Sequence, residues 1–154
     1  MNFKECFNNE KHRKILLIED NDQHKKIIFR FLNGVSGISL VHKKCLVDGI
    51  KYAEDNEVAL LLLDLSLPDA KGIETYRRAN EHLSNVPIVI LSAQEDMEIA
   101  KQLVHEGAQE FLYKTDLSKD ILLRTINSAC ERKNLELFLK KDSALKENLT
   151  EISK

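Results

Sequence analysis

The amino-acid sequence predicts a doubly wound α/β domain built on a five-stranded parallel sheet. Short apolar runs alternate along the chain with segments whose apolar residues recur at helical spacing. Such alternation favours parallel strands joined by right-handed crossovers. The runs are also almost continuously apolar, as in strands that helices cover on both faces. At 154 residues, the chain is long enough for one domain with a substantial core.

The expected strands follow these apolar runs. In chain order they cover residues 14–19, 38–41, 59–64, 87–92 and 111–114. The run at 38–41 alternates in part between apolar and polar residues, which is typical of an edge strand with one wetter face. The run at 59–64 is the most apolar, which indicates a central strand.

Caps and glycines bound the first helices. Asp20 or Asn21 can cap the helix after the first strand, and the Asn-Gly pair at 33–34 stops it. A short helix is expected at 46–53, where apolar residues recur at helical spacing. Residues 65–70 are expected to form a loop.

The later helices have similar boundaries. Gly72 opens the third helix, whereas Glu95 and Asp96 suit the N-terminus of the fourth, where acidic side chains are favoured. Gly107 stops that helix, and a turn at 115–118 leads into the last one.

Beyond the expected domain, residues 131–154 contain neither glycine nor proline and should continue as helix. Their apolar residues follow a heptad seam that Asp142 interrupts: Leu135, Phe138, Leu145, Leu149 and Ile152. An extended helix that frays, a dimerising coiled coil and a linker toward another domain are the three open interpretations. The expected division is a loose arm at 1–13, one domain at 14–130 and a helical extension at 131–154.

Composition argues against several classes of function. The net charge of −2 and the pI of about 6.2 give no global attraction to nucleic acid. No apolar run approaches the roughly 20 residues of a membrane span, and the first residues lack the apolar stretch of a signal peptide. Cys6, Cys45 and Cys130 are too widely spaced for a disulfide framework or a zinc motif. We therefore expect a cytoplasmic protein that binds neither nucleic acid nor membranes directly.

Polar residues suited to phosphoryl chemistry lie at the carboxyl ends of four of the five expected strands. They are Glu19 and Asp20, Asp64, Ser92, and Lys114. Ligands of open parallel sheets bind beyond the carboxyl ends of the strands, so these side chains should meet at one edge. Taken singly, Glu19 and Asp20 could be only a helix cap and Asp64 only a turn residue. Their occurrence together with a hydroxyl and an ammonium favours a site.

The chemistry of this set points to Mg²⁺ and phosphate. Three crowded carboxylates repel one another unless a cation lies between them. Mg²⁺ prefers oxygen ligands and often combines one or two carboxylates with phosphate oxygens. Asp64 is the candidate nucleophile, because a carboxylate can attack phosphorus and hold the group as an acyl phosphate. Lys114 would neutralise a phosphoryl oxygen, and Ser92 would donate a hydrogen bond.

Across residues 14–130 the chain resembles the receiver domain of two-component response regulators. The resemblance rests on motifs in the order and spacing of that family: Ile18-Glu19-Asp20, Leu63-Asp64-Leu65-Ser66-Leu67-Pro68-Asp69 with Gly72 behind it, Ile90-Leu91-Ser92-Ala93, Gly107-Ala108 and Phe111-Leu112-Tyr113-Lys114. It implies a flavodoxin-like sheet with strand order 2-1-3-4-5.

The resemblance also implies roles for the acidic residues and the lysine. Asp64 matches the phospho-acceptor, whose donor would be a phosphohistidine on a histidine kinase or a histidine phosphotransfer protein. Asp20 and Asp64 match direct Mg²⁺ ligands, joined by the backbone carbonyl of Ser66. Glu19 matches an acid that acts on the metal through water, and Lys114 matches the lysine that contacts the phosphoryl group.

A switch is implied as well. Ser92 matches the hydroxyl that moves toward the phosphoryl group, and Phe111 matches the aromatic residue whose rotamer follows it. The surface of the fourth helix, fifth strand and fifth helix would respond, and it or the C-terminal helix could support a homodimer. The output pathway is not evident, and the chain could be the receiver piece of a hybrid sensor kinase or multidomain regulator.

Two rival functions use part of the same pattern. Haloacid-dehalogenase-like phosphatases also use a strand-end aspartate, but they carry a second aspartate two residues later, where this chain has Ser66. A pseudo-receiver would bind partners without being phosphorylated, and the complete acidic set argues against it. We expect a signalling module without independent substrate turnover.

Thr115 is a departure from the family pattern. Receivers usually have proline after the lysine, often preceded by a cis peptide bond. A cis bond before a residue other than proline costs about 2.5–4 kcal/mol. The sequence therefore predicts a trans bond between Lys114 and Thr115.

Overall fold

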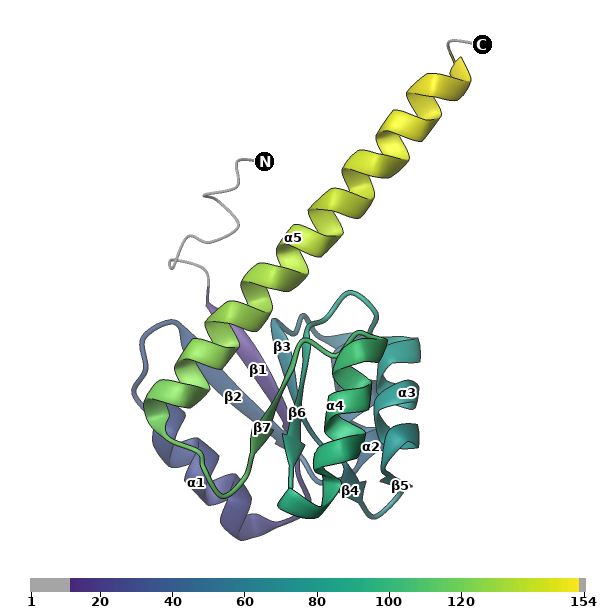
Figure 1. Ribbon diagram of the computed structural model, residues 1–154. Coiled ribbons are helices and arrows are strands. Elements are labelled where there is room, and N and C mark those ends of the chain that lie inside the picture. The colour runs from purple at the N-terminus through teal and green to yellow at the C-terminus, as the bar shows by residue number, and fades with distance from the viewer. Residues whose placement is uncertain (1–11, 153–154) are drawn as a thin grey trace.

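The computed structural model describes residues 12–152, with side chains described for residues 12–145. The expected loose arm falls mainly on residues 1–11, outside the described part. Five parallel strands form the main sheet: β1 (Arg13–Ile18), β2 (Ile38–Lys43), β3 (Leu60–Asp64), β6 (Ile88–Ser92) and β7 (Glu110–Tyr113). Their order is β2-β1-β3-β6-β7 (Figure 1). Counted along the main sheet alone, this is the predicted order 2-1-3-4-5.

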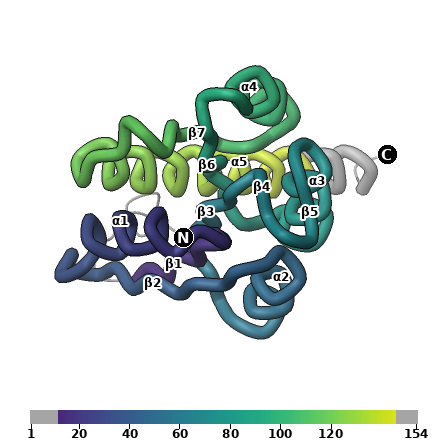
Figure 2. Tube along the Cα trace, turned by 90° about the horizontal axis from the view of Figure 1, so that it is seen from below, coloured from purple at the N-terminus to yellow at the C-terminus, as the bar shows by residue number. Residues whose placement is uncertain are grey.

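Helices cover both faces of the sheet (Figure 2). They are α1 (Asp22–Leu32), α2 (Leu46–Asp55), α3 (Ile73–His82), α4 (Met97–Glu106) and α5 (Lys119–Ile152), with a 3₁₀ turn at Gln94–Asp96 before α4. Buried residues of α2, α3 and α4 pack in one apolar cluster, and those of α1 and α5 pack in another. The predicted doubly wound α/β class is thus confirmed.

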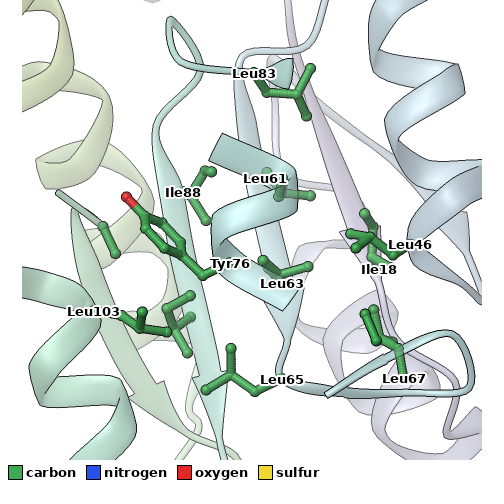
Figure 3. Packing of buried hydrophobic residues seen from close by; sticks show 14 of the residues in the cluster. Ile18, Leu46, Leu61, Leu63, Leu65, Leu67, Tyr76, Leu83, Ile88 and Leu103 are labelled. Carbon is green, nitrogen blue, oxygen red and sulfur yellow. The ribbon is translucent and has the colours of Figure 1, made fainter. Parts of the chain in front are cut away.

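Alternation along the central strands supplies both clusters. In β1, Leu16 and Ile18 face the cluster of α2, α3 and α4, whereas Ile15 and Leu17 face the cluster of α1 and α5. All four side chains are completely buried. Figure 3 shows the first cluster, in which Ile18 lies next to Leu46 of α2. A continuous apolar run is therefore required here, because both faces of the strand are covered.

The segment expected as a loop after β3 contains more structure than predicted. β4 (Ser66–Leu67) and β5 (Ala70–Lys71) form a short antiparallel pair. At its turn, Asp69 Oδ1 accepts a hydrogen bond from the Leu46 amide and Oδ2 accepts one from the Val47 amide, each at 2.9 Å. These amides begin α2, whose N-cap residue, Cys45, makes no side-chain cap bond. Asp69 therefore fastens the turn after β3 to the N-terminus of α2.

The last helix, α5, is continuous over 34 residues, and its C-terminal part extends away from the sheet (Figure 1). The predicted continuation of the last helix is confirmed as far as Ile152. Near the sheet, Glu136 accepts a hydrogen bond from Gln109 at 3.2 Å, and Arg132 pairs with Glu110 at 2.8 Å. Farther along, Phe138 and Leu145 are 55% and 59% exposed. The side chains of Leu149 and Ile152, expected on the same seam, lie outside the described residues.

Among residues 12–152, no helix has both the length and the apolar character required to cross a membrane.

Candidate functional site

The carboxyl ends of β1, β3 and β7 bring four of the predicted site residues together. One carboxylate oxygen each from Glu19, Asp20 and Asp64 lies within 4.8 Å of the others. The ammonium of Lys114 is 2.9 Å from Asp64 Oδ1 and 3.2 Å from Glu19 Oε2. Glu19 is completely buried and Asp64 is 3% exposed, whereas Asp20 is exposed. The four residues therefore form one acidic cluster, in which Lys114 supplies the counter-charge.

The cluster lines a cavity of about 630 Å³ at the strand ends. The other residues that line it come from the start of α1, the turn after β3 and the loop after β6: Asn21, His24, Leu65, Ser66, Lys71, Gly72, Ala93, Glu95 and Asp96. A cavity at the carboxyl edge of a parallel sheet, beside a change in strand order, is the usual ligand position in this architecture.

Local hydrogen bonds hold Glu19 in place. Its amide continues the sheet by donating to the Lys43 carbonyl at 3.1 Å, and its own carbonyl accepts from His42 Nε2 at 2.6 Å. Its Oε1 accepts from the Asn21 amide at 3.1 Å. Glu19 is therefore fixed through both its backbone and its side chain, which orients the carboxylate toward Lys114.

Asp20 and Asn21, which precede α1, have different roles. Asn21 is the cap, since its Oδ1 accepts hydrogen bonds from the amides of Gln23 and His24 at 2.9 and 3.2 Å. Of the two caps that the sequence allowed, the structure uses Asn21. Asp20 is consequently not occupied by capping, and its carboxylate joins the acidic cluster.

The pKa values in the cluster reflect burial and ion pairing. Burial and the neighbouring Glu19 carboxylate raise the pKa of Asp64 from 3.8 to about 7, and Lys114 offsets only part of this. Burial alone would lower the pKa of Lys114, but its pairs with Asp64 and Glu19 outweigh burial and raise it. Without a further cation, the site therefore holds its proton on Asp64 unusually tightly.

The turn after Asp64 is fixed from within. The Ser66 amide donates to Asp64 Oδ1 at 3.2 Å. The Leu65 carbonyl accepts from the Gly72 amide at 2.8 Å and from the buried Thr75 hydroxyl at 3.3 Å. These bonds hold Ser66, whose backbone carbonyl was an expected metal ligand, at the rim of the cavity.

The two predicted switch residues lie on adjacent strands. Ser92 is completely buried, and its hydroxyl donates to the Ala93 carbonyl at 2.8 Å. Phe111 is partly buried, and its ring meets that of Tyr113 edge-on, with 5.4 Å between centroids. In this structure the Ser92 hydroxyl is thus engaged with the backbone after β6. Ser92 is absent from the cavity lining, whereas the other four polar residues at the strand ends belong to it.

The peptide bond between Lys114 and Thr115 is trans, as predicted, since the described residues contain no cis peptide bond.

His24 is a cavity residue that the sequence-based prediction missed. Its Nδ1 lies 3.6 Å from Glu19 Oε1. Burial lowers the pKa of this imidazole, and the nearby Lys114 ammonium lowers it further. The only sequence signal is the position of His24 in the first helical turn, four residues after Asp20.

The donor set of the cluster fits a hard divalent cation. Three carboxylates supply oxygen donors, and a backbone carbonyl is available at the turn after β3. Glu19 Oε2 is buried and accepts no hydrogen bond within the described residues, although Lys114 lies at ion-pair distance. A buried carboxylate oxygen with spare acceptor capacity can serve a metal or a metal-bound water.

Comparison with known proteins points to one family. The family model of the response regulator receiver domain matches residues 15–127. The response regulator UvrY of Escherichia coli is 26% identical over 109 residues, which cover 70% of this chain and 50% of UvrY. The swarming motility regulation protein RssB of Serratia marcescens is 32% identical over 113 residues, covering 71% of this chain and 50% of RssB. The matched region thus spans about half the length of these relatives.

Solved structures show the same fold. A response regulator receiver domain protein from Clostridium thermocellum superposes with a TM-score of 0.70 at 26% identity, covering 80% of this chain and 98% of that one. The receiver domain of a LuxO repressor protein from Vibrio parahaemolyticus superposes with a TM-score of 0.72 at 24% identity, covering 83% and 97%. Because the family model spans most of the chain, this chain belongs to the response regulator receiver domain family.

Proposed function

We propose that the protein is a phospho-accepting receiver in which Asp64 takes a phosphoryl group from a phosphohistidine of a histidine kinase or histidine phosphotransfer protein. The observation that carries this proposal is the contact of one ammonium, that of Lys114, with both Asp64 and Glu19 in an accessible cavity. Such an arrangement supplies a nucleophile and a fixed positive charge at the same point.

In the proposed reaction, an Asp64 oxygen forms a bond to phosphorus while the phosphorus–nitrogen bond of the donor breaks. The bond electrons leave with the donor imidazole, which is protonated by solvent. Lys114 binds a phosphoryl oxygen, and the turn held by Thr75 keeps Asp64 aimed into the cavity. Asp20, Asp64 and the Ser66 carbonyl would hold Mg²⁺, with Glu19 acting through water. The ion would supply charge neutralisation for the phosphoryl oxygens.

We further propose that the product is a signal and not an intermediate of turnover. A phosphatase of the haloacid-dehalogenase type needs a second acid two residues after its nucleophile, and Ser66 occupies that position. The Ser66 hydroxyl accepts a hydrogen bond from Lys71 at 3.4 Å, and a hydroxyl is not a base that can activate water.

We place this function in the cytoplasm. The free thiols of Cys45 and Cys130 are in keeping with a reducing compartment.

The proposed readout is a steric switch. A phosphoryl group on Asp64 adds about −1.5 to −2 charge and strong acceptor oxygens. The Ser92 hydroxyl would exchange its bond to the Ala93 carbonyl for one to these oxygens, which leaves space for the Phe111 ring. Since Phe111 lies in β7, the change would reach the surface of α4, β7 and α5.

Incubation with Mg²⁺ and acetyl phosphate tests the proposal. Stable incorporation of one phosphoryl group is expected in the native chain and none in Asp64→Asn. Asp69→Asn is the matched control: this carboxylate lies on the next turn but caps α2, so labelling should persist. Continuous release of phosphate would identify a phosphatase instead. Absence of labelling in the native chain would identify a pseudo-receiver.

We also propose that the exposed seam of α5 mediates a homodimer. Leu135, Phe138 and Leu145 are 41%, 55% and 59% exposed, at the spacing of a coiled coil. The native chain should show a mass that rises with concentration in light scattering. Phe138→Lys should reduce this rise, whereas Lys140→Ala, outside the seam, should not. A monomer mass at every concentration would remove this proposal.

A further inference from the structure

The imidazole of His24 borders the acidic cluster, and none of the roles described above uses it. His24 lies in the first turn of α1, where its amide is held by the Asn21 cap. Its Nδ1 atom is buried and has no hydrogen-bond partner within the described residues. A ring nitrogen that makes no hydrogen bond keeps its lone pair available for a ligand.

The position of this nitrogen suits a shared cation better than a hydrogen bond. Nδ1 is 3.6 Å from Glu19 Oε1, which is too long for a hydrogen bond. Two ligand atoms bound to one ion at about 2.1 Å each lie about 3.0–3.4 Å apart. A small side-chain rotation would bring Nδ1 and Glu19 Oε1 to that separation. The side chain of His24 is 37% exposed, so it has room for this movement.

The compact three-carboxylate set, Glu19, Asp20 and Asp64, does not itself include His24. His24 adjoins it on the Glu19 side. There His24 and Glu19 would bind the ion directly, in place of the water through which Glu19 acts on Mg²⁺. The site would then offer one nitrogen donor beside its oxygen donors.

A nitrogen donor changes which metals the site prefers. Mg²⁺ gains little from imidazole because it favours oxygen ligands. Co²⁺ and Ni²⁺ accept imidazole readily and bind mixed nitrogen–oxygen sites more tightly. We propose that His24 is a further metal ligand, which gives the acidic site a preference for divalent transition metals such as Co²⁺ and Ni²⁺ over Mg²⁺. This inference rests on the metal site of the proposed function.

The test measures metal affinity of the full chain by calorimetry, with Mg²⁺, Co²⁺ and Ni²⁺ titrated separately. In His24→Leu, the affinities for Co²⁺ and Ni²⁺ should fall by about tenfold or more, whereas the affinity for Mg²⁺ should change by less than about twofold. His105→Leu is the matched control, because it removes an exposed histidine of α4 that does not line the cavity. Its affinities for all three metals should stay at the native values.

A second readout isolates the nitrogen ligand. The visible absorption spectrum of the Co²⁺-loaded native chain should differ from that of His24→Leu and match that of His105→Leu. Unchanged Co²⁺ affinity and spectrum in His24→Leu would overturn the inference, as would an equal loss for Mg²⁺ and Co²⁺. Neither measurement involves phosphorylation. If acetyl phosphate fails to label the native chain, the proposed function is rejected. The metal titrations and the Co²⁺ spectrum test the His24 assignment separately.

Discussion

The Asp64→Asn variant is expected to be more stable than the native chain at pH 8 when divalent cations are removed. In the folded protein, burial and Glu19 raise the pKa of Asp64 to about 7, against an ordinary value of 3.8. As the pH rises from about 4 to 7, the unfolded chain loses this proton first, so the native fold loses stability. At about 1.4 kcal/mol per pKa unit, the native chain loses at most about 4 kcal/mol of unfolding free energy. Asparagine does not ionise, so the variant does not lose stability in this way as the pH rises.

Urea unfolding in a chelator at pH 5 and pH 8 measures this effect. The native chain should be less stable at pH 8 than at pH 5. In Asp64→Asn, the difference in unfolding free energy between the two pH values should be smaller. Asp69→Asn provides the control. Burial of Asp69 would raise its pKa, but hydrogen bonds from the Leu46 and Val47 amides outweigh burial and lower it. That variant should therefore gain no stability at pH 8. An equal pH dependence in the native chain and Asp64→Asn would contradict the prediction.

The Lys114→Met variant is expected to have the opposite effect. Lys114 contacts Asp64 and Glu19 and is only 12% exposed, so its removal leaves two buried carboxylates without their ammonium. Breaking a buried pair in this way costs about 3 kcal/mol or more. The loss should be largest at pH 8, because at pH 5 Asp64 is mainly protonated. Mg²⁺ should restore more stability to this variant than to the native chain, since it replaces the missing positive charge.

Unfolding of Lys114→Met with and without Mg²⁺ checks this expectation. Lys71→Met is the matched control, because Lys71 lines the same cavity but is exposed and contacts the Ser66 hydroxyl only at 3.4 Å. Its stability should change by less than about 0.5 kcal/mol. If both lysine variants unfold at the same urea concentration, the proposed role of Lys114 as the counter-charge of the cluster is wrong.

Much of the site could be predicted because it depends on strand ends. Asp64 and Lys114 follow short apolar runs that are typical of strands in a covered sheet, and parallel strands bring their carboxyl ends to one edge. Glu19 and Asp20 follow from the same argument. Proximity of these residues therefore requires only the strand order and direction, both of which the alternating pattern strongly restricts.

Other features of the site and fold could not be predicted, because they depend on how helices pack and turns bend, and local sequence patterns do not indicate either. His24 approaches Glu19 only because α1 begins directly at the sheet edge. Asp69 caps α2 across 23 positions of sequence, so its partner could not be inferred from neighbouring residues. The short pair of β4 and β5 likewise replaces an expected loop, since two-residue strands leave no periodicity to detect.

The sequence by itself determined the α/β class, the continuous last helix and the acidic cluster with its lysine, because each follows from a local pattern and from strand direction. Only the tertiary structure decided that Asn21 caps α1, that Asp69 caps α2 and that His24 borders the acidic cluster. The physical reason is that these contacts join side chains to groups on separately packed elements. Their distances are set by how helices pack on the sheet, and packing depends on the whole core.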